Sequence, residues 1–281
     1  MKQFRQKRIA ITGGASGLGK ALALRAADAG WKVAIVDIND QRGAETLEEL
    51  QVKGTECFYQ RCDVTKTESV EALRDEVVKR WGGLDIMVNN AGVATHGAID
   101  AAQMSDWEWV VNINLLGVVR GCKVFSALFK EQGYGHLVNV ASMAGLLYSP
   151  EMSSYNATKA GVVALSETMR AELEPFNIGV TLVCPGFFQT NLAESARSPE
   201  PGAQQMINKL LSMSTIDADD IADMILNAVE KKKFWLLPHS SYRYMWYMKR
   251  YLPGFYHKGM VTMARKMLAK NGRLKAALQS S

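Results

Sequence analysis

Apolar residues along the chain follow two spacings in turn, and these spacings predict strands and helices in regular alternation. Runs rich in β-branched and apolar residues predict strands at 8–12, 32–37, 55–60, 84–88, 137–141, 178–183 and 234–237. Segments with apolar residues three and four positions apart predict helices at 21–27, 41–52, 67–80, 105–130, 153–174 and 217–230. This alternation predicts an α/β fold, with a doubly wound parallel sheet of about seven strands covered by helices on both faces.

A glycine-rich turn joins the first predicted strand to the first predicted helix. It reads Gly13, Gly14, Ala15, Ser16, Gly17, Leu18, Gly19. A helix N-terminus offers unpaired N–H groups and a partial positive charge to a pyrophosphate. We expect Gly13 to permit the tight turn, Gly17 to let the backbone approach the phosphates, and Gly19 to allow close packing of the helix.

Polar residues follow the next three predicted strands. Asp37 ends the second strand, 24 residues after Gly13, where a carboxylate can hold an adenosine ribose and repel a 2′-phosphate. Its position favours NAD over NADP, although a helix cap or turn residue would look the same. Asp63-Val64 follows the third strand and is placed to meet an adenine. The small residues of 89–92 follow the fourth and suit a backbone pressed against a ligand.

Tyr155 and Lys159 are four residues apart at the start of a predicted helix, so both side chains point to one face. A tyrosine normally titrates near pH ~10, and a neighbouring cation favours the phenolate. We therefore expect Lys159, together with a positively charged cofactor ring, to lower the pKa of Tyr155. Ser142 ends the fifth strand, where its hydroxyl can hydrogen-bond a substrate oxygen beside Tyr155. The alternative is an ordinary surface pair on a helix.

Two asparagines, Asn112 and Asn114, lie inside the long apolar helix predicted at 105–130. Asparagine is unfavourable there because its side chain competes for backbone hydrogen bonds. We expect one of the two to have a specific role.

Taken in chain order, these motifs resemble those of the short-chain dehydrogenase/reductase family. The matching motifs, over roughly residues 5 to 238, are Thr12-Gly13-x-x-x-Gly17-x-Gly19, Asn89-Asn90-Ala91-Gly92, Ser142, Tyr155-x-x-x-Lys159 and Pro185-Gly186. The resemblance implies a Rossmann-type fold and hydride transfer between an alcohol or ketone and a nicotinamide cofactor.

The resemblance also implies a role for each matching residue. Tyr155 would be the general acid/base, and Lys159 would lower its pKa and hold the nicotinamide ribose. Ser142 would orient the substrate oxygen, and Asn114 would be the structural and proton-relay asparagine, because it lies three residues before Gly117. The implied cofactor-binding residues are Gly13, Ser16, Gly17, Leu18, Gly19, Asp37, Ile38, Asp63, Val64, Asn90, Ala91, Gly92, Tyr155, Lys159, Pro185, Gly186, Phe188 and Thr190. No metal site is expected.

The last 43 residues differ from the rest in charge. The chain has a net charge of +5, but 239–281 contains nine Lys and Arg and no Asp or Glu, which leaves about −4 for 1–238. We therefore divide the chain into a catalytic domain, 1–238, and a basic extension, 239–281, rich in aromatic residues and methionine. The extension either packs over the substrate cleft or against another subunit, or it contacts a membrane surface. No nucleic-acid-binding motif accompanies its charge.

Apolar residues near the predicted site favour a hydrophobic substrate. Met206 and Met213 lie in a segment expected to act as a lid, 191–214, and Phe187 and Phe188 come just before it. A long-chain, terpenoid or steroid-like secondary alcohol is the first expectation. The alternatives are a ketone or 3-oxoacyl-type reductase using NAD(P)H and a non-catalytic NAD-binding sensor or scaffold.

Several features bear on location and assembly. No run of 18 uncharged apolar residues occurs, and the N-terminal segment lacks a secretory pattern. The four cysteines lack metal-binding spacing and are expected to be reduced thiols. We expect a cytoplasmic protein, with peripheral membrane contact as an option for 239–281. The family resemblance implies a homodimer or homotetramer through the helices at 106–130 and 153–174.

Overall fold

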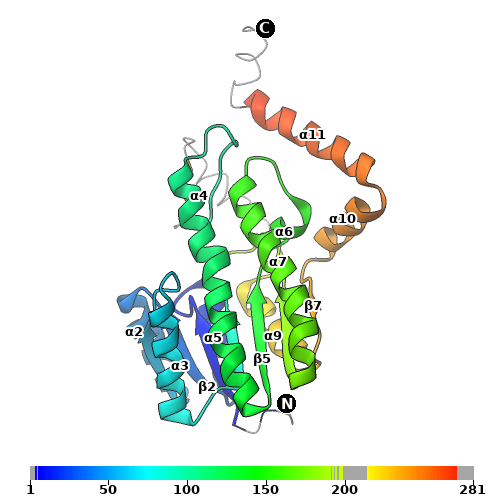
Figure 1. Cartoon of the computed structure of the whole chain (residues 1–281). Helices are drawn as coiled ribbons and strands as arrows, with labels where there is room; N and C mark the ends of the chain where they lie inside the picture. Colours follow the sequence, from blue (N-terminus) through cyan, green and yellow to red (C-terminus); the bar gives the residue numbers. More distant parts are fainter. Residues whose placement is uncertain are drawn as a thin grey trace.

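Seven parallel strands form one sheet in the order β3-β2-β1-β4-β5-β6-β7 (Figure 1). The computed structural model describes residues 4, 6–190, 192, 194, 196–198 and 214–270. The predicted α/β, Rossmann-type doubly wound sheet is confirmed. The strands are β1 Arg8–Thr12, β2 Lys32–Asp37, β3 Cys57–Arg61, β4 Ile86–Asn89, β5 Gly135–Val140, β6 Ile178–Val183 and β7 Trp235–Leu236.

Helices connect successive strands and cover the sheet. They are α1 Gly17–Asp28, α2 Asp40–Val52, α3 Thr67–Trp81, α4 Met104–Val111, α5 Gly117–Gln132, α6 Ala144–Leu147, α7 Ser153–Leu173, α9 Ala218–Glu230, α10 Ser240–Tyr251 and α11 Pro253–Lys270. Short η1 (Asn112–Leu116) and η2 (Glu174–Phe176) segments follow α4 and α7.

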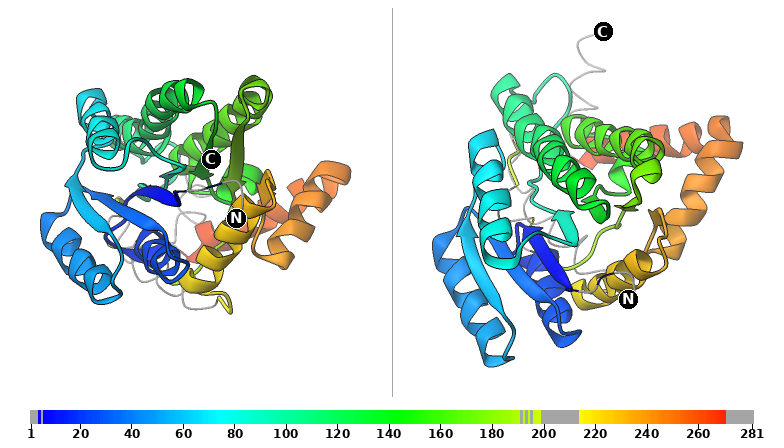
Figure 2. Two further views of the ribbon diagram at one scale, coloured as in Figure 1. Left: turned by 90° about the horizontal axis from the view of Figure 1, so that it is seen from below. Right: turned by 60° about the horizontal axis from the view of Figure 1, so that its bottom comes forward.

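Alternate residues of each strand face opposite layers, which divides the core in two. In β1, Ala10 packs with the side chains of α3, α5 and α7, while Ile9 and Ile11 pack with those of α1 and α9. Figure 2 shows the resulting three layers, with the sheet between the two sets of helices. Because both faces are covered, the ligand-accessible edge of the sheet is the one where the strands end.

The helix predicted at 105–130 is not a regular α-helix. Residues 112–116 form a π-helical turn between α4 and α5, and Asn114 is buried there. Length and composition alone would let the whole stretch Met104–Gln132 cross a membrane. Here its apolar residues cover the sheet, with Phe125 and Phe129 fully buried in the core.

The chain reverses its winding direction between β1 and β4, and this reversal opens a crevice at their carboxyl ends. Thr12, the last residue of β1, forms hydrogen bonds there with the loop that follows β4. Its Oγ1 accepts hydrogen bonds from the N–H groups of Asn90 and Ala91, at 3.0 and 3.1 Å. The side-chain amide of Asn90 in turn donates through Nδ2 to the carbonyl oxygens of Thr12 and Gly13. The loop after β4 is therefore held against the glycine-rich turn after β1.

The helices of the extension, α10 and α11, follow β7 and lie on the side of the molecule away from α2 and α3 (Figure 1). They are held to α6 by two side chains. Lys249 Nζ donates to the carbonyl oxygen of Leu146, and the Tyr256 hydroxyl donates to that of Leu147. The predicted division of the chain at 238 falls between β7 and α10.

Candidate active site

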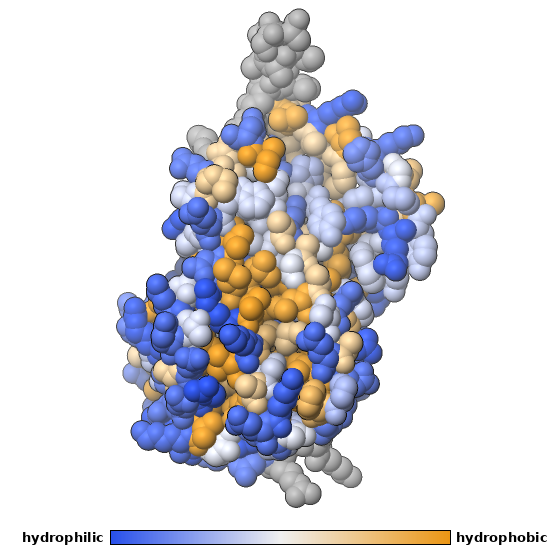
Figure 3. Space-filling view, in the orientation of Figure 1, coloured by the Kyte–Doolittle hydropathy of each residue, from blue (hydrophilic) through white to orange (hydrophobic). Residues whose placement is uncertain are grey.

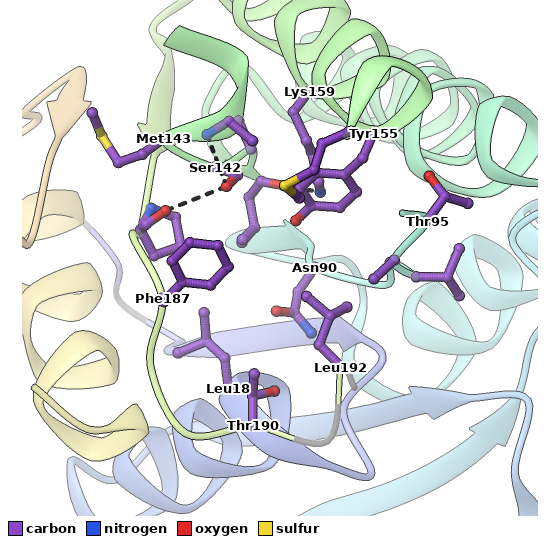
Figure 4. A pocket seen from close by; sticks show the side chains of 18 of the residues that line it. Leu18, Asn90, Thr95, Ser142, Met143, Tyr155, Lys159, Phe187, Thr190 and Leu192 are labelled. Carbon is purple, nitrogen blue, oxygen red and sulfur yellow. Dashed lines mark hydrogen bonds between the residues drawn. The ribbon is translucent and has the colours of Figure 1, made fainter. Parts of the chain in front are cut away.

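A cavity of about 600 Å³ lies at the carboxyl ends of the strands and brings most of the predicted site residues together. Figure 4 shows Ser142, Tyr155 and Lys159 at one end and Leu18 and Thr190 at the other, with Asn90 between them. The predicted residues in its wall are Gly13, Ser16, Leu18, Asp37, Ile38, Asp63, Val64, Asn90, Ala91, Gly92, Ser142, Tyr155, Lys159, Pro185, Gly186, Phe188 and Thr190. Gly17, Gly19 and Asn114 are not among the residues that line it.

The glycine-rich turn is packed too tightly for larger residues. A β-carbon on Gly19 would lie 2.0 Å from the carbonyl oxygen of Gly13 and 2.7 Å from the amide nitrogen of Asn90. Gly13 and Gly17 have φ angles of +62° and +49°, a region that non-glycine residues rarely adopt. The turn therefore leaves the N-terminus of α1 at the cavity, as an anion-binding cradle requires.

Asp37 stands beside this cradle. Its carboxylate accepts hydrogen bonds from the N–H groups of Ala15 and Asn39, at 3.1 and 3.0 Å. Arg42 also lines this part of the cavity, and its guanidinium donates to Glu194 at 2.7 Å. Both the ion pair with Glu194 and the nearby charge of Asp37 raise the pKa of Arg42.

Asp63 is held by the residues that follow it. Its carboxylate accepts hydrogen bonds from the N–H and the hydroxyl of Thr65, at 2.9 and 2.7 Å. With Asp63 and Val64 in the cavity wall, the loop after β3 forms the side of the cavity near Asp37 and Ile38.

Tyr155 and Lys159 lie one turn apart on α7, both buried. Lys159 Nζ is 5.8 Å from the centre of the Tyr155 ring and donates to the carbonyl oxygen of Val140 at 3.0 Å. The surface-pair alternative is therefore wrong, because these side chains meet inside the cavity.

The pKa values differ from the prediction. Burial raises the pKa of Tyr155 to about 12, and the opposing effect of its hydrogen bond with Ser142 is smaller. Burial also lowers the pKa of Lys159 to about 8, since a charged ammonium is poorly solvated there. The expected lowering of the Tyr155 pKa is thus absent from the protein alone, because burial of the phenol dominates; the expectation also included a positively charged cofactor ring.

Ser142 and Asn114 hold the backbone around this pair. Ser142 Oγ accepts a hydrogen bond from the N–H of Ala144 at 3.1 Å and donates to the carbonyl oxygen of Pro185 at 3.4 Å. Asn114 Oδ1 accepts from the N–H of Val93 at 2.8 Å, and its Nδ2 donates to the Val93 carbonyl oxygen at 2.9 Å. Asn114 thereby fixes the segment after β4, while Asn112 Oδ1 accepts a hydrogen bond from Arg120 at 2.9 Å.

Two pairs of polar side chains beside the cavity were not predicted, because they belong to no recognisable sequence motif. Thr95 and Ser154 share a hydrogen bond of 2.7 Å between their hydroxyl groups. His96 Nε2 lies 3.7 Å from Glu151 Oε2, and both side chains are buried. These residues are more than fifty positions apart, so only the folded chain shows that the loop after β4 is clamped to the start of α7.

The extension forms part of the cavity wall. Its lining residues are Tyr242, Met245, Tyr256, Met260, Met263 and Met267. His239 fastens the start of the extension to the site, because its Nδ1 accepts a hydrogen bond from the N–H of Gly186 at 3.1 Å. Burial lowers the pKa of His239, which keeps that nitrogen available as an acceptor. Phe187 and Phe188 also line the cavity, whereas Met206 and Met213 of the expected lid lie outside the described residues.

A family model for the short chain dehydrogenase matches residues 7–201, more than half of the chain. The chain belongs to the short-chain dehydrogenase/reductase family. The predicted resemblance is thereby confirmed, and the protein is an oxidoreductase of this family.

Similar proteins support the same assignment for this short-chain dehydrogenase. The chain is 34% identical over 260 residues to a CLA biosynthesis dehydrogenase/reductase of Lactiplantibacillus plantarum, covering 86% of this chain and 91% of that one. A short chain dehydrogenase/reductase of Burkholderia phymatum, solved with NAD, is 31% identical and superposes with a TM-score of 0.85, covering 89% and 95% of the two chains.

A third similar protein was solved with a different cofactor. An alcohol dehydrogenase of Thermococcus sibiricus, complexed with 5-hydroxy-NADP, is 28% identical, with a TM-score of 0.73 and coverage of 84% and 97%. The glycine cradle and the polar residues at its rim fit a dinucleotide in this chain too. Gly13, Ser16 and Leu18 would meet its pyrophosphate, and Asp37 and Asp63 would meet the adenosine end.

Proposed function

We propose that the protein is an NAD-dependent oxidoreductase that transfers a hydride between an apolar secondary alcohol or ketone and the nicotinamide. The observation that carries this proposal is the placement of Ser142, Tyr155 and Lys159 at one end of a cavity whose other walls are largely apolar. A non-catalytic NAD-binding protein would not need a buried tyrosine, lysine and serine at this position.

In this proposal the substrate oxygen lies between Ser142 and Tyr155. Ser142 orients that oxygen by a hydrogen bond, and the Tyr155 hydroxyl gives a proton to a ketone or, as phenolate, takes one from an alcohol. When bound, NAD⁺ would accept a hydride from an alcohol or NADH would supply one to a ketone, and the oxidised ring would add a positive charge to the cavity. Because burial alone raises the pKa of Tyr155, the neutral phenol is its stable form in the protein alone, and a nearby positive charge is needed for the phenolate.

Lys159 has a second role in this proposal, which is to bind the cofactor. Its hydrogen bond to Val140 fixes the ammonium on the face of α7 that carries Tyr155. From there its remaining donors can reach a ribose hydroxyl at the nicotinamide end of the cavity. We assign Lys159 to this binding role as well as to the electrostatic support of Tyr155.

The carboxylate of Asp37 supports NAD rather than NADP. A 2′-phosphate beside it would meet a like charge, whereas a ribose diol could donate hydrogen bonds to it. Arg42 lies close enough to neutralise a phosphate, but Glu194 already occupies its guanidinium. We therefore propose NAD as the preferred cofactor.

Methionine and aromatic side chains support an apolar substrate. Met245, Met260, Met263 and Met267 come from the extension, and Phe187 comes from the loop after β6. Methionine side chains are flexible and adapt to apolar ligands of differing shape. We propose a long-chain, terpenoid or steroid-like alcohol. The name of the L. plantarum relative, a dehydrogenase/reductase, is compatible with a ketone reductase working in the reverse direction.

The proposal is tested by measuring NADH formation with secondary alcohols of increasing chain length. We expect kcat/KM to rise with chain length and to be higher with NAD than with NADP. Equal kcat/KM values for short and long alcohols would contradict the proposed preference for an apolar substrate. Tight NAD binding with no turnover of any alcohol, and no reduction of the matching ketones, would instead favour the sensor.

We also propose that copies of the chain associate through the helices at 106–130 and 153–174. Apolar side chains gather over α5 and α7 on the face seen in Figure 3. In these helices Leu116 of η1 is exposed, and Leu115, Val163 and Leu165 are partly buried. The mass in solution, measured by light scattering, tests this assembly.

A further inference from the structure

Aromatic side chains form an exposed stripe on the extension. Tyr244, Tyr247 and Tyr251 are three or four residues apart and therefore lie on one side of α10, and Phe255 lies in the first turn of α11, after the break at Leu252. Their exposed fractions are 72%, 47%, 72% and 67%, and Leu252 between them is 59% exposed. Apolar residues at this spacing usually face a protein core, but the opposite side of α10 already packs on the cavity through Tyr242 and Met245.

Exposed cations flank the stripe. Arg243, Arg250 and Lys258 are all exposed, and none forms an ion pair with the part of the chain that the structure describes. The whole segment 239–281 has nine Lys and Arg and no Asp or Glu. Two copies meeting through this surface would bring like charges together. An anionic surface would be attracted to it, and aromatic residues beside cations are typical of segments that lie in the interface of a bilayer.

The catalytic cavity extends to the same region. Met263 and Met267 of α11 line it, and they also line a second cavity with Gly259, Thr262 and Lys266. Met263 is 41% exposed, so the apolar wall of the active site reaches the surface on α11, the helix that also carries Phe255. An apolar molecule dissolved in a bilayer could enter along this wall without crossing water.

We propose that α10 and α11 dock on the headgroup region of an anionic lipid bilayer. Tyr244, Tyr247, Tyr251 and Phe255 enter the interface, and the neighbouring cations meet the lipid phosphates. The protein lies on the membrane in this arrangement and does not span it. This docking is a property of the extension, so its test does not depend on the proposed reaction.

The test measures co-sedimentation of the full chain with vesicles of phosphatidylcholine containing phosphatidylglycerol, at low and high salt. The wild type should bind at low salt and be released at high salt, because screening weakens the attraction. It should bind vesicles of phosphatidylcholine alone much more weakly. Equal binding to both kinds of vesicle would overturn the charge complementarity, and no binding to either would overturn the proposal.

Two pairs of substitutions separate the contributions of aromatic residues and charge. The double variant Tyr251→Ser/Phe255→Ser should bind anionic vesicles at least about tenfold more weakly. Its matched control, Val52→Ser/Ile99→Ser, changes two exposed apolar residues elsewhere and should bind like the wild type.

The charge contribution is tested by Arg243→Gln/Lys258→Gln, which should bind anionic vesicles roughly thirtyfold more weakly, because each cation near an anionic surface raises the affinity by about a factor of five. Its control, Lys66→Gln/Lys79→Gln on the far side of the molecule, should lose far less.

A subunit interface is the main competing occupant of this surface. If the stripe were buried between copies, Tyr251→Ser/Phe255→Ser would lower the mass measured by light scattering, and anionic vesicles would not sediment the wild type. That result would overturn the proposal. An unchanged mass together with weaker vesicle binding would support it.

Discussion

Lys159 Nζ lies 5.8 Å from the centre of the Tyr155 ring and is tied to the carbonyl oxygen of Val140. Both side chains are buried, and burial shifts both pKa values toward the neutral forms, to about 8 for Lys159 and about 12 for Tyr155. At neutral pH the phenol is therefore neutral, while Lys159 still carries its charge. A cofactor that adds positive charge would have its largest effect on the phenol in such an environment.

The low pKa of Lys159 predicts a pH-dependent stability. Below pH 8 the ammonium is charged in both the folded and unfolded chain, and the folded state carries the full desolvation penalty. As pH rises from about 8 to 10.5, the folded state loses its proton first and the penalty disappears. Relative to Lys159→Met, the wild type should therefore gain up to about 3 kcal/mol in free energy of unfolding over this range.

Urea denaturation of both proteins at pH 7 and pH 10 measures this change. Other titrating groups are common to the two proteins and largely cancel in the difference. Lys123→Met, at an exposed position on α5, provides the control and should show no such trend. A constant difference between the wild type and Lys159→Met at both pH values would contradict the pKa assigned to Lys159.

The contact between Gly19 and Gly13 predicts that Gly19→Ala disrupts the cofactor cradle. The added β-carbon would meet backbone at 2.0 Å, so the turn or α1 has to move. We expect roughly a hundredfold loss in NADH affinity, or about 3 kcal/mol, by fluorescence titration. Gly254→Ala is the control, since a β-carbon there meets nothing within 4 Å. Wild-type affinity in Gly19→Ala would show that the turn does not bind the cofactor.

Asp37→Ser should change the choice between cofactors. Removing the carboxylate removes the repulsion of a 2′-phosphate, so the ratio of kcat/KM for NAD to that for NADP should fall by about a hundredfold. Asp40→Ser changes a nearby exposed carboxylate that is bound to Arg61 and does not line the cavity, and it should leave the ratio unchanged. If Asp37→Ser left the ratio at its wild-type value, the preference for NAD would need another source.

A buried ion pair at the amino ends of β1 and β4 predicts a large loss of stability when it is broken. Asp85 accepts hydrogen bonds from Arg8 N, Nε and Nη2, at 2.8, 3.3 and 3.0 Å. Asp85→Ala would leave the guanidinium buried without its partner, which should lower the free energy of unfolding by about 3–5 kcal/mol. Glu49→Ala breaks the exposed pair with Lys20 and should change it by less than about 1 kcal/mol. Similar losses for the two variants in chemical denaturation would contradict this difference.

The sheet was predictable from sequence because each buried strand is a short apolar run that needs no long-range information. The glycine cradle and the Tyr155–Lys159 pair were predictable for a related reason, since their residues are close in sequence. The π-helical turn around Asn114 was not, because it depends on the hydrogen bonds of that side chain to Val93, on a different segment.

The environment of the site was harder to predict than its residues. Sequence spacing shows the cation next to Tyr155 but not how completely both groups are buried, and in the protein alone this burial raises the pKa of Tyr155; the lowering expected with a bound cofactor stays a prediction. The His96–Glu151 pair joins segments far apart in sequence and follows no motif. For the extension, composition left cleft packing and membrane contact open, and the structure shows that one side of α10 lines the cavity while the other is exposed.

The most direct measurement is the turnover of Tyr155→Phe, which removes the hydroxyl and keeps the ring. Turnover of a long-chain secondary alcohol with NAD should fall by roughly 10²–10⁴-fold, the usual contribution of proton transfer by a placed side chain. NADH affinity, measured by fluorescence titration on the same sample, should stay near that of the wild type. Near-normal turnover in Tyr155→Phe would contradict the assignment of this hydroxyl as the general acid/base.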